Sequence, residues 1–136
     1  MHLLFLLLLL LSFISSANAE PWSKWDSALA GAAVTTIGID WGQTRWMVKN
    51  PCINAGGGTD CPDPYYENGI IAKRFIGEHP TTGQVDRYFL AYAATTLLVA
   101  DWLSPPLRKG FLALTTVVQI GYVSHNYRIG VKMALQ

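Results

Sequence analysis

The sequence has few charged residues and almost no net charge. Only 14% of its 136 residues are Asp, Glu, Lys or Arg, and the formal net charge is +1. This balance excludes a strongly basic nucleic-acid-binding protein and an acidic tail. Cysteine is also scarce, because the chain has only two. Two cysteines exclude a disulfide-dense scaffold and a zinc site made of four cysteines.

Common catalytic motifs are missing as well. The sequence contains no H-E-x-x-H metal-binding motif, no G-x-S-x-G nucleophile motif and no glycine-rich phosphate-binding loop. Three consecutive glycines at positions 56–58 precede no predicted helix, so we interpret them as part of a loop. These absences favour a non-enzymatic protein that needs no cofactor and binds no nucleic acid.

The first 19 residues carry no charge, and 14 of them are apolar. They end in Ala17-Asn18-Ala19, the small-residue pattern that precedes a signal-peptidase cut. The apolar stretch is shorter than the roughly 20 residues that span a bilayer, which favours cleavage over retention as a membrane anchor. We therefore predict a signal peptide over residues 1–19 and Glu20 as the first residue of the mature chain.

Three stretches of the mature chain lack Lys and Arg, at residues 27–44, 88–107 and 110–127. Each is close to the length that crosses a bilayer and is flanked by basic residues. Thr81 and Gln84 have the spacing of a capping box, and Ser104 before Pro105 is expected to cap the third helix with its side chain. The pattern predicts helices over about 25–48, 82–103 and 105–127, with a loop over 50–80.

We therefore predict an all-α fold, in which residues 20–136 form a single domain, a three-helix up-down-up membrane bundle that follows a cleavable signal peptide. Seven basic residues fall on the side of the long loop and three on the other side. By the positive-inside rule, the loop then faces the cytoplasm and the protein lies in the bacterial inner membrane. The expected partners are the lipid bilayer and either a second copy of the chain or another envelope protein. A soluble periplasmic helical module remains the alternative.

Both cysteines, Cys52 and Cys61, lie in the predicted loop. In a secreted chain such a pair is a disulfide candidate. The predicted topology instead places the loop in the reducing cytoplasm, where the two residues would be free thiols. A Cys52–Cys61 disulfide would therefore favour the periplasmic alternative.

Polar residues gather toward one end of the predicted bundle. Asp40, Gln43 and Thr44 share a face of the first helix, and the third helix carries His125 and Asn126 near the same end. The loop leaves and re-enters on this side. The candidate polar cluster consists of Asp40, Gln43, Thr44, Glu67, Asn68, His79, His125 and Asn126. Asp101 falls at the opposite end, where Arg108 and Lys109 suggest a tie across the turn.

Hydrogen bonding between helices is the favoured role of this cluster. The alternative is a membrane-embedded metal-binding protein or hydrolase that uses Asp40, Glu67 and His125, because ionisable groups inside a membrane are often functional. No metal site is assigned beyond these three candidate ligands.

Four strings in the sequence support a family resemblance. They are Asp40-Trp41-Gly42-Gln43-Thr44, then Glu67-Asn68, then the run from His79-Pro80 to Tyr88-Phe89, and His125-Asn126 with Gly130. They resemble small uncharacterised signal-bearing membrane proteins of Gram-negative bacteria, prophages and tailed phages, which read D-x-x-Q-T, E-x-N-P, H-P-S-x-G-x-V-x-x-Y-F and H-N-x-x-x-G. Here Glu67 and Asn68 are adjacent and no proline follows, so the second motif is altered.

The resemblance covers most of the mature chain and implies a membrane location and a phage origin, without an assigned activity. The predicted function is that of a small, non-enzymatic integral envelope protein that acts through membrane or protein contacts. A phage origin would suggest an accessory role in lysis or the exclusion of superinfecting phages.

Overall fold

A computed structural model of the chain describes residues 20–50 and 70–133. It contains helices α2 (Lys24–Lys49), α3 (Ile70–Ile76), α4 (Thr82–Trp102) and α5 (Pro105–Arg128). The described residues are 82% helical and include no strand, so the all-α prediction is confirmed. The long helices lie where the charge-free stretches placed them. The predicted uninterrupted loop over 50–80 was wrong, because α3 lies inside it.

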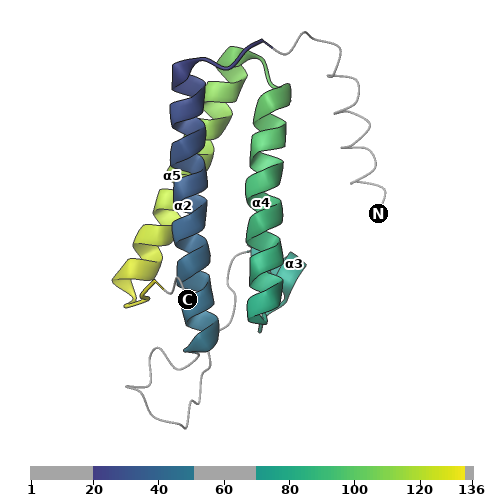
Figure 1. Cartoon of the computed structure of the whole chain (residues 1–136). Helices are drawn as coiled ribbons and strands as arrows, with labels where there is room; N and C mark the ends of the chain where they lie inside the picture. The colour runs from purple at the N-terminus through teal and green to yellow at the C-terminus, as the bar shows by residue number, and fades with distance from the viewer. Residues whose placement is uncertain (1–19, 51–69, 134–136) are drawn as a thin grey trace.

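The three long helices run down, up and down (Figure 1). Helix α2 packs against both α5 and α4, and the short α3 packs against α4. We call the end that holds residues 20–26 and the α4–α5 turn the turn end. The opposite end, where α2 and α5 finish and α4 begins, is the loop end. Helices α2 and α5 run in the same direction, so their C-terminal halves meet at the loop end.

Capping residues set the helix starts. Ser23 and Asp26 form a capping box for α2, and Thr81 and Gln84 form the predicted box for α4. The predicted side-chain cap by Ser104 was wrong, because its hydroxyl makes no capping hydrogen bond. Two prolines follow Ser104, and a proline at the second helical position removes one of the amides that such a cap would bind. The Ser104 carbonyl instead accepts from the Arg108 amide at 2.8 Å.

Two apolar clusters form the core. The one nearer the turn end contains mostly small side chains, Ala30, Ala33 and Ala100, packed around Leu112. The one nearer the loop end consists of Ile37, Ile76, Val85 and Phe89. Ile76 belongs to α3, so this short helix is held by packing on α4. Gly77 ends α3 with a φ of 84°, a left-handed conformation that glycine adopts without strain.

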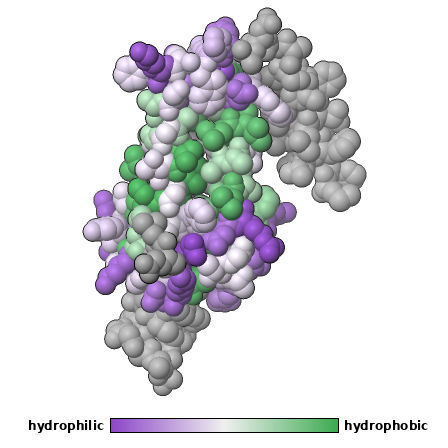
Figure 2. Space-filling model, in the orientation of Figure 1, coloured by the Kyte–Doolittle hydropathy of each residue, from purple (hydrophilic) through white to green (hydrophobic). Residues whose placement is uncertain are grey.

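Many large apolar side chains lie outside the core. Figure 2 shows a hydrophobic zone over the middle of one face, with hydrophilic residues above and below it. Within residues 20–50 and 70–133, no helix combines the length and mean hydropathy needed to cross a membrane.

Candidate functional site

Three of the predicted polar residues meet between α2 and α5 at the loop end. The Asn126 side-chain nitrogen donates to the Asp40 carboxylate at 3.2 Å and to the Gln43 side-chain oxygen at 3.1 Å. The Gln43 nitrogen donates to the carbonyl of Val123 at 3.3 Å. Gln43 is 2% exposed, so these hydrogen bonds join the two helices in the interior. The shared polar face and the parallel course of α2 and α5 were sufficient to predict this meeting.

The other candidates of this cluster are placed differently. Thr44 is buried beside Gln43 on α2, whereas His79 and His125 are exposed. Glu67 and Asn68 lie outside the described residues, as do Cys52 and Cys61. In the part of the chain that the structure describes, no three His, Cys, Asp or Glu residues are grouped to hold a metal ion. The trio of Asp40, Glu67 and His125 therefore stays a hypothesis.

Gln119 adds an unsatisfied polar group to the same interface. It lies one helical turn before Val123 on α5 and is 4% exposed. Its side-chain oxygen accepts no hydrogen bond from the described residues. A buried amide oxygen without a donor lowers stability, because the group has lost its hydrogen bonds to water.

A second polar contact joins α2 to the start of α4. The Trp41 indole nitrogen donates to the Asp86 carboxylate at 2.8 Å, and the Arg45 Nε lies 3.5 Å from the same oxygen. This role of Asp86 was not predicted from the sequence. The contact joins two helices that are far apart in the sequence. No local sequence pattern predicts it before the pairing of these helices is known.

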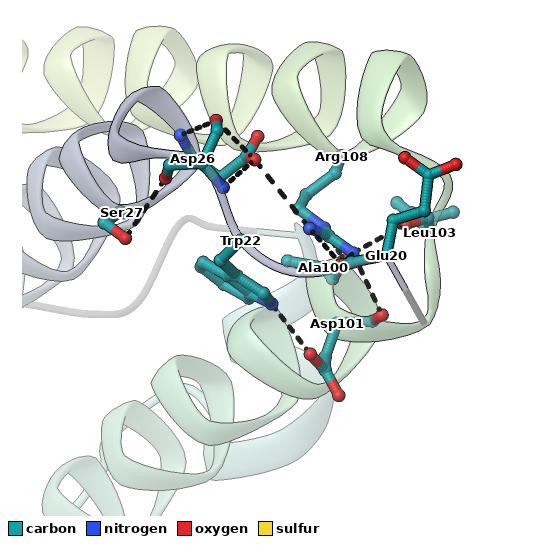
Figure 3. A network of polar contacts seen from close by, with 9 residues as sticks. Glu20, Trp22, Asp26, Ser27, Ala100, Asp101, Leu103 and Arg108 are labelled. Atoms are coloured by element: carbon teal, nitrogen blue, oxygen red, sulfur yellow. Dashed lines mark hydrogen bonds and ion pairs between the residues drawn. The ribbon is translucent and has the colours of Figure 1, made fainter. Parts of the chain in front are cut away.

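The turn end is organised around Arg108, which is completely buried (Figure 3). Its Nε donates to the Ala100 carbonyl at 2.9 Å, and one terminal nitrogen donates to the Leu103 carbonyl at 3.2 Å and the Asp101 carbonyl at 3.4 Å. Both terminal nitrogens donate to the Glu20 carbonyl, at 3.3 and 3.2 Å. One guanidinium thus binds the end of α4, the turn after it and the segment that precedes α2.

Two further side chains surround this guanidinium. The Asp26 carboxylate lies 3.8 Å from Arg108 and is held by the Ser23 amide and hydroxyl, at 2.8 and 2.6 Å. The Trp22 ring lies against Arg108, with 5.1 Å from the guanidinium carbon to the ring centroid, and its indole nitrogen donates to the Asp101 carboxylate at 2.7 Å. The expected tie between Asp101 and Arg108 therefore runs through the Asp101 carbonyl, while its carboxylate binds Trp22.

These clusters can align helices, and their polar groups are largely occupied in doing so. The donors of Arg108 bind main-chain carbonyls, and the Asn126 amide bridges two acceptors. The described part of the site thus presents hydrogen-bonded contacts between helices. No protein-family model, curated protein or solved structure matches the chain. The resemblance to phage and bacterial membrane proteins stays a prediction.

Proposed function

We propose that the protein is a small, non-enzymatic envelope protein whose helical bundle is embedded in the bacterial inner membrane and acts through contacts with lipid and other proteins. The observation that carries the proposal is the distribution of side chains between interior and surface. Several charged and amide side chains lie inside the bundle, and many large apolar side chains lie outside.

The polar interior includes an ion pair and two amides. Asp26 and Arg108 are at most 1% exposed, and Gln43 and Gln119 are nearly as deeply buried. A charged group that leaves water needs compensating partners. Arg108 has such partners in the surrounding carbonyls. Arg108 can therefore be held in a medium that offers no water, whereas the Gln119 oxygen and one Asp26 oxygen lack a donor among the described residues.

The apolar exterior is most pronounced on α4 and α5. Leu98 is 59% exposed, Leu114 64% and Val117 65%. Leaving one such side chain in water forgoes about 1.5–3 kcal/mol of burial free energy. Contiguous apolar surface of this kind is typical of contact with lipid or with another protein. The further exposed apolar residues of these two helices are Leu90, Leu97, Leu107, Val118 and Ile120.

The length of this apolar surface is close to the thickness of the hydrocarbon core of a bilayer. Residues 110–127 of α5 carry no Asp, Glu, Lys or Arg, and at 1.5 Å per residue this segment is about 27 Å long, against about 30 Å for the hydrocarbon core. Exposed aromatic residues lie near both ends of the bundle: Trp25 is 74% exposed and Tyr127 77%. Such residues are enriched at the two membrane–water interfaces.

A single charged substitution in this surface distinguishes contact with lipid from contact with water. Val117 lies near the middle of α5 and faces outward. If residue 117 faces hydrocarbon, Val117→Asp should raise the free energy of membrane insertion by about 3 kcal/mol or more. If it faces water, the substitution should change the folding stability by no more than about 0.5 kcal/mol. The matched control is Lys109→Asp, which places the same side chain at an exposed position near the N-terminal end of α5. The readout is the fraction of full-length chain that remains with membranes after alkaline carbonate extraction.

We expect the wild-type chain and Lys109→Asp to stay in the membrane pellet, and Val117→Asp to be retained less or degraded. Release of the wild-type chain by carbonate would overturn the proposal. Retention of all three proteins to the same extent would show that α5 does not face lipid. Thiol labelling of Cys52 and Cys61 from outside intact cells, with and without reductant, tests the topology. The predicted cytoplasmic loop should remain unlabelled.

The phage roles are tested by expression. A lysis accessory that forms pores should kill the host abruptly on induction, and an exclusion protein should block infection of viable cells. A host that grows normally and remains fully sensitive to phage would rule out both roles.

A further inference from the structure

The two ends of the bundle differ in the charge that remains available for a partner. At the loop end, the acidic residues of the described chain are engaged within the protein. Asp40 accepts from Asn126, Asp86 contacts Trp41 and Arg45, and Glu78 pairs with Lys73. The hydrogen bond and charge of Lys73 lower the pKa of Glu78. This carboxylate therefore stays ionised and paired.

The basic residues at the same end exceed these acids. Arg74, Arg87 and Arg128 are exposed and form no ion pair with other described residues. At the turn end, by contrast, the exposed basic residues Lys24 and Lys109 are equal in number to the exposed acidic residues Glu20 and Asp101. Among the described residues, exposed arginine without an ion-pair partner therefore lies only at the loop end.

Each of these arginines is next in sequence to an aromatic residue. Phe75 follows Arg74 and is 71% exposed, and Tyr127 precedes Arg128 and is 77% exposed. Tyr88 follows Arg87, and its ring lies 6.3 Å from that of Phe75, so the aromatic residues next to Arg74 and Arg87 lie close together. Aromatic rings favour the headgroup level of a bilayer, and the arginine fork binds phosphate with two parallel hydrogen bonds.

We propose that the loop end binds the headgroups of anionic phospholipids, with Arg74, Arg87 and Arg128 on the phosphates and Phe75 and Tyr127 in the interfacial layer. The proposal rests on the proposed membrane location and adds the class of lipid. Charge complementarity selects the occupant, because a basic surface next to an apolar one matches an anionic headgroup above acyl chains. Residues 51–69 contain Asp60, Asp63 and Glu67 outside the described part, so the test uses the full chain.

The test measures which lipid the protein retains. The full chain is reconstituted in vesicles that mix phosphatidylcholine with phosphatidylglycerol, extracted in mild detergent, and its bound lipids are quantified. We expect phosphatidylglycerol to be enriched about fivefold or more over its share of the vesicle, since one basic residue near an anionic surface contributes about that factor. High salt should reduce the enrichment.

The combined variant Arg74→Gln, Arg87→Gln and Arg128→Gln should bring the retained ratio down to that of the vesicle. Its matched control, Lys24→Gln with Lys109→Gln, should keep the enrichment. Circular dichroism of each variant establishes that it is folded. Equal enrichment in both variants, or none in the wild-type chain, would overturn the proposal. Loss of enrichment when inorganic phosphate is added at constant ionic strength would also overturn it, because the site would then bind free anions.

The two proposals fail differently. A chain that does not enter vesicles of either composition contradicts the membrane location itself. A chain that enters both and retains the two lipids in the vesicle ratio leaves the membrane location intact and removes only the lipid preference.

Discussion

Replacing Arg108 by methionine removes a side chain that joins residue 20, the end of α4 and the α4–α5 turn. Methionine keeps much of the volume but leaves the Asp26 carboxylate buried without the guanidinium and removes the donor of the Leu103 and Glu20 carbonyls, whereas the Ala100 carbonyl keeps the hydrogen bond of the Leu103 amide. Breaking a buried ion pair from one side costs about 3–5 kcal/mol. A domain of this size is stable by about 5–15 kcal/mol, so the variant should be severely destabilised.

The expected loss has two parts that a double-mutant cycle separates. Asp26→Asn alone removes an ion pair whose atoms lie 3.8 Å apart but leaves Arg108 its main-chain carbonyl acceptors, so it should cost less than Arg108→Met, about 1–2 kcal/mol. In the Arg108→Met background the same change removes an uncompensated charge. It should therefore restore part of the loss, leaving the cost of the unsatisfied carbonyls. Arg108→Lys should fall between wild type and Arg108→Met, because an ammonium cannot reach all the carbonyls that the planar guanidinium binds.

The assay is denaturant unfolding of the full chain followed by far-ultraviolet circular dichroism, with one detergent for all variants. Lys132→Met is the control, since this exposed residue lies beyond the end of α5 and should change stability by less than about 0.5 kcal/mol. The reasoning would be refuted if Arg108→Met unfolded within about 1 kcal/mol of wild type. It would also be refuted if Asp26→Asn cost as much as Arg108→Met, since the carboxylate alone would then carry the effect.

Three smaller changes test the remaining polar contacts by the same unfolding assay. Asn126→Asp replaces a donor by a carboxylate that faces Asp40, so it should lose about 2–3 kcal/mol at neutral pH and recover in acid, and a pH-independent loss would contradict this. Trp22→Phe keeps a ring near Arg108 but removes the hydrogen bond to Asp101, and should cost about 1 kcal/mol. Gln119→Leu removes an unsatisfied buried amide, so its stability should equal or exceed wild type, and a loss above about 1 kcal/mol would show that the amide has a partner.

The sequence was informative wherever the signal was local or periodic. Charge-free stretches and the Thr81–Gln84 capping box placed the long helices, and helical spacing placed Asp40 and Gln43 on the face that meets Asn126. Helix α3 was missed because its seven residues are too few to show a period. It is held by the packing of Ile76 in the core at the start of α4.

The position of Arg108 was not predictable in the same way. In the sequence it flanks a charge-free stretch, and such a residue is normally expected to face solvent or lipid headgroups. In the structure it turns inward, because the Glu20 carbonyl and those of residues 100–103 converge on it. That convergence exists only after the segment before α2 has packed on the α4–α5 turn.

The mean hydropathy of a helix averages over its inward and outward faces, which differ in polarity in this fold. On α5, Arg108 and Gln119 point into the bundle, while Leu114 and Val117 point outward.

The core between the helices is largely alanine near the turn end, so apolar packing there gives little preference for one helix alignment over another. Hydrogen bonds from Arg108 and Asn126 supply that preference instead. They are most effective where water does not compete for the same groups, because a buried polar group then has no alternative partner. An apolar surround would exclude that water, so the exposed apolar surface and the hydrogen-bonded interior both support the proposed membrane location.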